Sequence, residues 1–189
     1  PYDSYVNDAS GMLNALASHW QTNNSGISRD LVHLLSKRGN TGTGGIAWLD
    51  ALCSTSIGYA FSSALSNDTT YSFPNPNYTW NLSVCAHEIG HNIGSSHTHD
   101  CVWSADASYG FVGPGIDNCG VMAGYTNDCN PPATSPPGGF GTIMSYCHTS
   151  GSGASGVVLN FHNIVVSQAL DPGIASASCL SICSTDGCI

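Results

Sequence analysis

Positive charge is almost missing from this chain, which has only 3 Lys and Arg among its 189 residues. Against 12 Asp and Glu, this leaves a formal net charge of −9. A chain with so few bases cannot neutralise a run of phosphates and release their counterions, as nucleic-acid-binding proteins do. We therefore expect no nucleic acid partner, and anionic membrane surfaces are disfavoured on the same ground.

Long apolar runs are missing as well. No stretch approaches the roughly 18 consecutive apolar residues that would span a bilayer, and residues 1–10 lack the basic and apolar regions of a signal peptide. We expect a soluble, already processed chain with no membrane span. Its 41% of hydrophobic residues can offset the entropy cost of folding, and its length suits one domain with a real core.

Cysteine, in contrast, is abundant. Nine Cys in 189 residues exceed what a reducing cytosol usually tolerates in a domain of this size, which predicts a secreted, disulfide-bonded protein. A cysteine metal cluster is the alternative, but no CxxC pair occurs, and Cys179 and Cys183 are four residues apart. Because nine is odd, at least one thiol is free, pairs with another chain, or lost its partner when a segment was removed.

Hydrophobic periodicity predicts a mixture of helices and strands. Apolar residues recur every three or four positions over residues 5–20, with Asp8 and Ser10 as candidate caps, and this predicts an amphipathic helix. Residues 82–93 show the same spacing after a polar loop rich in Pro and Asn. The other expected elements are strands over 30–36, 44–53 and 56–61, an irregular stretch over 95–139, and a last helix over 164–170.

One segment combines histidine and glutamate at spacings that suit a metal ion. Residues 87–97 have the sequence HEIGHNIGSSH, of the form HExxHxxGxxH. Residues four apart on an α-helix are offset by only about 40° and about 6 Å along the axis, so His87 and His91 can present their imidazoles to one ion. Glu88 flanks that face and can reach a metal-bound water without ligating the metal. It is also the only glutamate in the chain.

His97 can join this pair only if the helix ends before it. On a continued helix it would lie about 120° away, and Gly94 is where the chain can leave the helix, because glycine accepts the left-handed conformation. Three neutral histidines then leave one position for water, as in a catalytic zinc site. Buried core histidines and a structural zinc are the alternatives, but structural sites usually close the fourth position with Cys.

Together with residues 141–146, GTIMSY, the histidine segment resembles the metzincin zinc endopeptidases, in which a methionine-containing turn follows the extended motif. Residues 12–53 further resemble the adamalysin or reprolysin branch and the bacterial secreted proteins like it, although Thr98 stands where adamalysins have Asp. The resemblance implies an α/β (α+β), metzincin-like catalytic domain over residues 1–189. Its upper subdomain, 1–96, would hold a twisted mixed sheet with the active-site helix above the cleft, with the family's first strands and helix missing. Its lower subdomain, 97–189, would be irregular and disulfide-stapled.

The resemblance also implies a role for each site residue. His87, His91 and His97 are the expected ligands of Zn²⁺, Glu88 is the expected general base, and Met144 is expected to pack beneath the metal without binding it.

Other positions around the motifs are less sharply assigned. Tyr146 matches a position that binds zinc or stabilises the transition state in the astacin and serralysin branches, and simple packing is the alternative. Residues 45–49 resemble the edge strand to which a protein or peptide substrate adds as an extended strand. Residues 148–161 would line the pocket after the cleaved bond. His99 and His148 are expected at the surface or around the site, and not as ligands.

These expectations favour a secreted zinc-dependent endopeptidase that hydrolyses internal peptide bonds through a zinc-bound water activated by Glu88. A catalytically silent member of the same fold, which binds protein or sugar, is a second hypothesis that the intact Glu88 disfavours. A third is a deformylase-like hydrolase of small amides, which the third histidine and the methionine turn disfavour. Nothing in the sequence predicts the oligomeric state.

Overall fold

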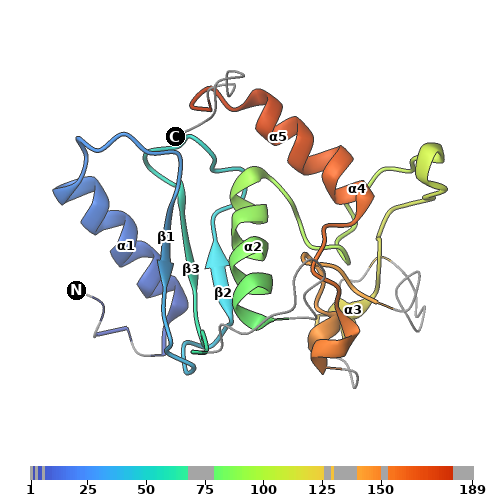
Figure 1. Cartoon of the computed structure of the whole chain (residues 1–189), viewed down its shortest axis with the longest axis horizontal. Helices are drawn as coiled ribbons and strands as arrows, with labels where there is room; N and C mark the ends of the chain where they lie inside the picture. Colours follow the sequence, from blue (N-terminus) through green and yellow to red (C-terminus); the bar gives the residue numbers. More distant parts are fainter. Residues whose placement is uncertain are drawn as a thin grey trace.

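A three-stranded mixed sheet lies between two helices, α1 (Ala9–Asn23) and α2 (Trp80–Ile93), in the computed structural model of the chain (Figure 1). The structure describes residues 2, 4–5, 7–67, 79–125, 129, 140–149 and 153–180. This mixed α/β arrangement confirms the fold class expected from the sequence.

The first helix begins at a capping aspartate. The Asp8 carboxylate accepts a hydrogen bond from the Gly11 N–H at 2.8 Å, which satisfies one of the unpaired donors at the helix start. Met12, Leu13 and Leu16 form the buried face of α1 and pack in the clusters that hold the central strand. The helix predicted over 5–20 is confirmed, with both ends three or four residues further along the chain.

The sheet consists of β1 (Val32–Leu35), β2 (Gly45–Ala47) and β3 (Tyr59–Ser62), in the order β1-β3-β2. The central strand, β3, is buried along its whole length and pairs parallel with β1 and antiparallel with β2. All three predicted strands are present, but the strand expected over 44–53 keeps only its first residues. Asp50 and Cys53 have φ angles of 52° and 67°, and this conformation cannot continue an extended strand.

The loop after β2 holds the end of α2 in place. The helix starts after Thr79, whose hydroxyl accepts from the Leu82 N–H at 3.2 Å, and it ends at Gly94, which has a φ of 124°. The last carbonyls are satisfied from outside the helix, since the backbone N–H groups of residues 50–52 donate to the carbonyl oxygens of His91 and Asn92 at 2.7–2.9 Å. The predicted helix end at Gly94 is confirmed, and the loop that follows β2 anchors this end of α2.

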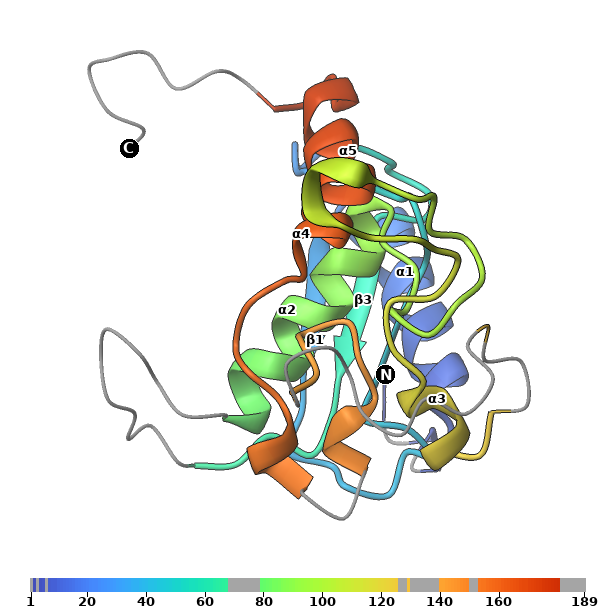
Figure 2. The ribbon, with the colours of Figure 1, turned by 90° about the vertical axis from the view of Figure 1, so that its right-hand side faces the viewer.

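The second half of the chain is largely irregular, as expected. Its first part contains η1 (Ala107–Tyr109), α3 (Cys119–Met122), η3 (Cys147–Thr149) and η4 (Gly153–Gly156). Then α4 (Asn163–Val165), the π-helical η5 (Val166–Leu170) and α5 (Asp171–Ser176) follow one another alongside α2, on the side away from the sheet (Figures 1 and 2). The helix predicted over 164–170 therefore continues further than expected. The π-helical stretch ends two residues before Pro172, which has no N–H to continue an α-helical ladder.

Disulfide bonds join distant parts of the chain. They connect Cys53 with Cys179, Cys101 with Cys129, and Cys119 with Cys147, which confirms the predicted disulfide-bonded protein. Cys85 is the free cysteine of the described residues, and Cys183 and Cys188 lie outside them. Among the helices that the structure describes, none is long and apolar enough to cross a membrane.

Candidate metal centre

Three histidine side chains meet at the C-terminal end of α2. His87 and His91 lie one turn apart on the helix, and His97 reaches them from the segment that follows Gly94. The Nε2 atom of His91 lies 3.1 Å from that of His87 and 3.2 Å from that of His97. The three residues that the sequence spacing singles out are thus within reach of one ion.

The outer ring nitrogens of two of these histidines fix their tautomers. His87 Nδ1 lies 2.7 Å from the Ile143 carbonyl oxygen, and His91 Nδ1 lies 2.7 Å from the Ser95 carbonyl oxygen. Because a carbonyl oxygen only accepts, each Nδ1 carries the proton and each Nε2 presents a lone pair. Two lone pairs 3.1 Å apart repel each other unless a cation lies between them. The donor set therefore fits a metal ion.

Zinc suits these donors in both spacing and protonation. Two zinc–nitrogen bonds of about 2.0–2.1 Å at a tetrahedral angle separate the nitrogens by about 3.3 Å, close to the separations in the structure. Burial lowers the pKa of His87 to about 3 and that of His97 to about 2, and it also lowers the pKa of His91. All three rings are consequently neutral at pH 7, which is the form that binds metal.

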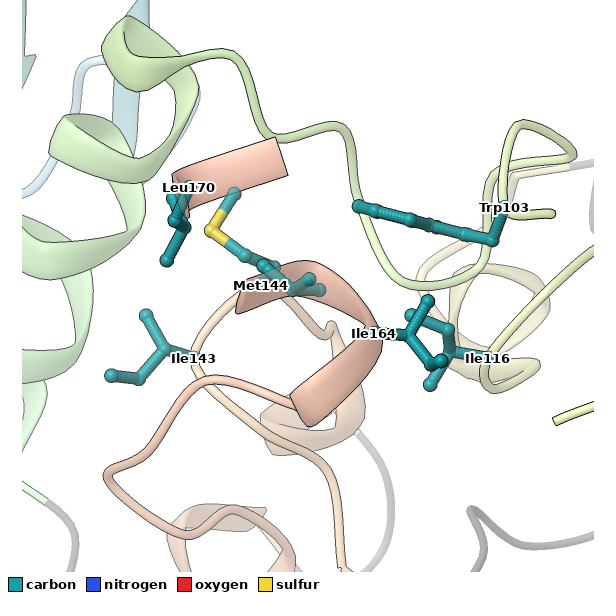
Figure 3. Packing of buried hydrophobic residues seen from close by; sticks show 7 residues of the cluster. Trp103, Ile116, Ile143, Met144, Ile164 and Leu170 are labelled. Carbon is teal, nitrogen blue, oxygen red and sulfur yellow. The ribbon is translucent and has the colours of Figure 1, made fainter. Parts of the chain in front are cut away.

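The methionine turn, residues 141–146, supports the histidines from the second half of the chain. Met144 is fully buried and packs in one cluster with Ile164 and Leu170 (Figure 3). Gly90 allows α2 to approach this turn, because a Cβ atom there would lie 2.6 Å from the Met144 Sδ. The neighbouring Ile143 carbonyl accepts from His87, so the turn both packs against the helix and orients a ligand.

Glu88 is enclosed between α2 and β2, with only 4% of its surface exposed. A Cβ atom on Gly45 would lie 2.7 Å from the Glu88 Cδ, so the strand leaves room for this carboxyl group only because residue 45 is glycine. Burial raises the pKa of Glu88 to about 8. A carboxyl group with a pKa near neutrality can accept and return a proton, and Glu88 lines the same pocket as His87.

That pocket has a volume of about 310 Å³. Residues 42–45 form one wall, the α2 residues Trp80 and Val84 another, and Tyr146 and His148 a third. The Trp80 and His148 rings meet edge to face with their centroids 5.6 Å apart, and Trp80 Nε1 donates to the Ser63 carbonyl at 3.0 Å. Of the residues expected to line the pocket, 148–161, the structure places His148 and Thr149 there.

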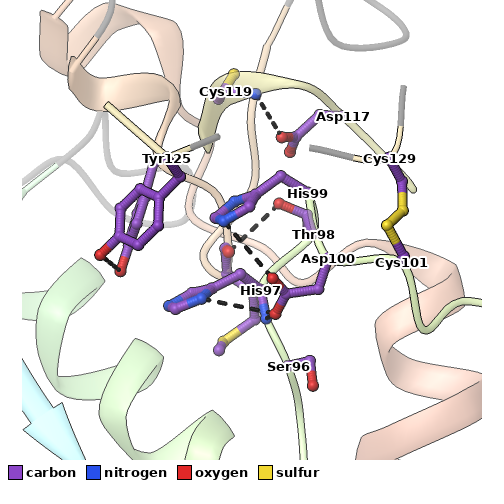
Figure 4. Close-up of polar contacts among 12 residues, drawn as sticks. Ser96, His97, Thr98, His99, Asp100, Cys101, Asp117, Cys119, Tyr125 and Cys129 are labelled. Carbon is purple, nitrogen blue, oxygen red and sulfur yellow. Dashed lines mark hydrogen bonds and ion pairs between the residues drawn. A yellow bond between two sulfur atoms is a disulfide. The ribbon is translucent and has the colours of Figure 1, made fainter. Parts of the chain in front are cut away.

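Aromatic rings contact the third histidine, His97, and Figure 4 shows the His99 ring beside it. The Tyr146 ring centroid lies 4.5 Å from that of His97, and the Tyr146 hydroxyl lies 3.4 Å from the Tyr125 hydroxyl. Burial, with a smaller effect of Tyr125, raises the pKa of Tyr146, so its hydroxyl stays protonated. His99 is buried and stacks on His97 at 5.1 Å and 9°. Sequence reasoning missed Tyr125, because it lies in a stretch that shows only turn signals.

A protein-family model matches the half of the chain that carries the histidines. The model, described as metallo-peptidase family M12B, reprolysin-like, covers residues 1–98. The matched part includes α1, the sheet, α2 and all three histidines, and it ends one residue after His97. A search of curated proteins finds no match to the chain.

Proposed function

We propose, because the chain belongs to the reprolysin-like metallo-peptidases of family M12B, that it is a secreted zinc endopeptidase cutting internal bonds of protein substrates. Membership of this family makes the chain a zinc metallopeptidase, which hydrolyses peptide bonds. The proposal adds secretion, internal cleavage, one catalytic domain over residues 1–189 and a role for each site residue. The observation that carries it is the convergence of three neutral imidazoles beside the buried carboxyl group of Glu88.

His87, His91 and His97 would hold the metal. Three protein ligands leave a coordination position for water or substrate, as catalytic zinc sites do. When bound, zinc lowers the pKa of a water molecule from 15.7 to about 7 and polarises the substrate carbonyl. The carbonyl oxygens of Ile143 and Ser95 hold two of the rings in the tautomer that this binding needs.

Glu88 serves as the general base and then as the general acid. Its carboxylate takes a proton from the water that attacks the carbonyl carbon and delivers it to the amine nitrogen as the carbon–nitrogen bond breaks. Burial raises the pKa of Glu88, and the positive charge of a bound zinc ion would lower it again, toward the range in which a general base works. Its enclosure by Gly45 keeps the carboxylate directed at the pocket.

Tyr146 would stabilise the oxygen that becomes negative during the attack. Tyr146 lines the pocket and keeps its hydroxyl protonated, and the Tyr125 hydroxyl at 3.4 Å supports its orientation. An oriented hydrogen-bond donor at this point stabilises the transition state more than the substrate. Packing against His97 remains the alternative role, and the assay below separates the two.

An extended substrate segment would lie along β2. Among the described strands β2 is at an edge of the sheet, with β3 on one side, and Gly45 lines the pocket. Addition of a strand at such an edge uses main-chain hydrogen bonds. Because these bonds do not depend on side chains, they suit a peptidase that cuts substrates of many different sequences. The disulfides support secretion, because such bonds persist in oxidising compartments.

Cleavage of denatured casein tests the proposal. We expect the zinc-loaded protein to give internal fragments, a chelator to stop cleavage, added zinc to restore it, and Glu88→Gln to be inactive at equal zinc content. Tyr146→Phe should lower kcat by about 10²–10³ with little change in KM if the hydroxyl stabilises the oxyanion, and should leave both unchanged if the ring only packs. Cleavage of small amides alone would favour a deformylase-like enzyme, and zinc binding without any cleavage would favour a silent binding protein.

A further inference from the structure

Among the residues that the structure describes, the third metal ligand has no backbone acceptor like those that orient the other two. Histidines that bind metals almost always donate their second ring N–H to a carboxylate, a carbonyl or a water. The His87 and His91 rings use carbonyl oxygens at 2.7 Å. Within the part of the chain that the structure describes, the polar group at His97 Nδ1 is the Asp100 carboxylate, with Oδ2 at 3.7 Å.

The backbone places Asp100 beside His97 with little freedom (Figure 4). Asp100 Oδ2 accepts from the His97 backbone N–H at 2.9 Å, and the Asp100 N–H donates to the His97 carbonyl oxygen at 3.1 Å. Trp103 Nε1 donates to the same carbonyl at 2.9 Å. This closed turn fixes both the ligand and its carboxylate, so their closeness is set by the fold and does not depend on a flexible surface contact.

His99 completes the arrangement on the other side of the carboxylate. Its Nε2 lies 3.7 Å from Asp100 Oδ1, and its ring stacks almost parallel on that of His97. The His99 side chain is buried, and its Nδ1 has no hydrogen-bond partner among the described residues. The Asp100 carboxylate therefore faces one ring nitrogen of each of two stacked imidazoles, one of which is a proposed metal ligand.

We propose that Asp100 is the positioning residue of the third ligand: its carboxylate attracts the His97 Nδ1–H across 3.7 Å, directs Nε2 at the metal and strengthens metal binding by its charge. The inference rests on the proposed zinc site. Three neutral imidazoles leave the double positive charge of zinc uncompensated, and a carboxylate behind one of them stabilises the bound ion. The Asp100 side chain is 37% exposed, so it can hold its charge while it contacts the ring.

The variant Asp100→Asn tests this role, with Asp171→Asn as the matched control. The amide oxygen of the substituted side chain can still accept from the His97 backbone N–H, so the turn is preserved while the charge is lost. Asp171 is exposed in the first turn of α5 and loses the same charge on an element that carries none of the three histidines. The readouts are the zinc Kd, by competition with a chromophoric chelator, and the Tm of the chelated protein.

We expect Asp100→Asn to raise the zinc Kd by about 10-fold to 100-fold, with the chelated Tm unchanged, and Asp171→Asn to change neither. An unchanged Kd in Asp100→Asn would overturn the inference. Equal effects of the two variants would also overturn it, because the loss of any negative charge would then weaken zinc binding. A fall in the Tm of the chelated protein that accounts for the weaker binding would overturn it as well, because Asp100 would then act only on the stability of the fold. If the unaltered protein itself bound no zinc, the proposed function would fail with it, whereas an unchanged Kd in a zinc-binding, casein-cleaving protein removes this inference alone.

Discussion

At the scale of single residues, Gly45 sets the position of the Glu88 carboxyl group. A side chain at residue 45 would bring a Cβ atom to 2.7 Å from Cδ and 2.8 Å from Cγ of Glu88. We expect Gly45→Ala to displace the flexible carboxyl group, because that costs less than moving the strand. A misplacement of about 1 Å can cost about 10²-fold in rate, so peptide cleavage should fall by roughly that factor while zinc content and Tm stay close to the original.

Gly26→Ala is the matched control for this change. A Cβ atom at Gly26 meets nothing within 4 Å, so this variant should keep the full rate of casein cleavage. The two variants differ in what the added methyl contacts and not in the substitution itself. Normal turnover by Gly45→Ala would show that the strand, and not the carboxyl group, gives way.

The ligand residues and the residues around them differ in how far the sequence predicts them. The spacing of His87, His91 and His97 is local, so helix geometry and one glycine are enough to bring these residues together. The tyrosines near His97 depend on contacts between distant segments. Tyr125 meets Tyr146 because the Cys119–Cys147 disulfide ties α3 to η3, and no pattern in the sequence indicates this pairing.

At the scale of elements, the contact between α2 and the methionine turn depends on a small residue. A Cβ atom on Gly90 would lie 2.6 Å from Met144 Sδ and 3.2 Å from Phe161 Cε1. We expect Gly90→Ala to push the helix off the turn at a cost of about 1–3 kcal/mol for overpacking, which over most of that range exceeds the roughly 1 kcal/mol that Ala gains in helix propensity. The thermal midpoint should fall, and zinc should bind more weakly, because the His87 acceptor belongs to the same turn.

Ile89→Ala on the neighbouring, more exposed position of α2 provides the comparison. It alters the same helix without touching the turn, so zinc affinity should stay unchanged. A Gly90→Ala protein that is more stable and binds zinc normally would contradict the role given to the close approach.

The ends of helices and strands are predicted less well from sequence patterns than the elements themselves. Gly94 ends α2 as predicted, because one residue type has the backbone freedom that the break needs. The strand expected over 44–53 is cut short by positive φ angles at Asp50 and Cys53, which are non-glycine residues held there by their surroundings. Backbone N–H groups from this loop cap α2, and such a tertiary role has no signature in hydrophobic periodicity.

At the scale of the whole molecule, buried histidines make the fold sensitive to acid. Burial lowers the pKa of His33 in the folded protein to about 4, against an ordinary value of 6.5. Between these values the unfolded chain binds a proton that the folded protein does not, so stability rises with pH in this window and is lost as the pH falls from 6.5 to 4.

The chelated protein should therefore melt at progressively lower temperature over that range, and His33→Gln should flatten the dependence. Glutamine does not titrate there and keeps a polar group near Ser62, which lies 2.8 Å from His33 Nε2. The lowered pKa values of His87 and His97 contribute with the same sign, so part of the slope should persist in the variant. Identical slopes for the two proteins would show that His33 takes no part.

The Cys53–Cys179 disulfide ties the loop that caps α2 to the chain beyond α5, across a separation of 126 residues. Such a crosslink restricts the unfolded chain, and its loss from a secreted domain typically costs about 2–5 kcal/mol. For a chain of this size each kcal/mol shifts Tm by about 2–4 °C, so the double variant Cys53→Ser, Cys179→Ser should melt roughly 5–20 °C lower. Cys85→Ser removes the free thiol as a control and should have a much smaller effect. If the double variant and Cys85→Ser had the same Tm, the Cys53–Cys179 bond would not stabilise the fold. The loop that caps α2 and the chain beyond α5 would then be held together by packing alone.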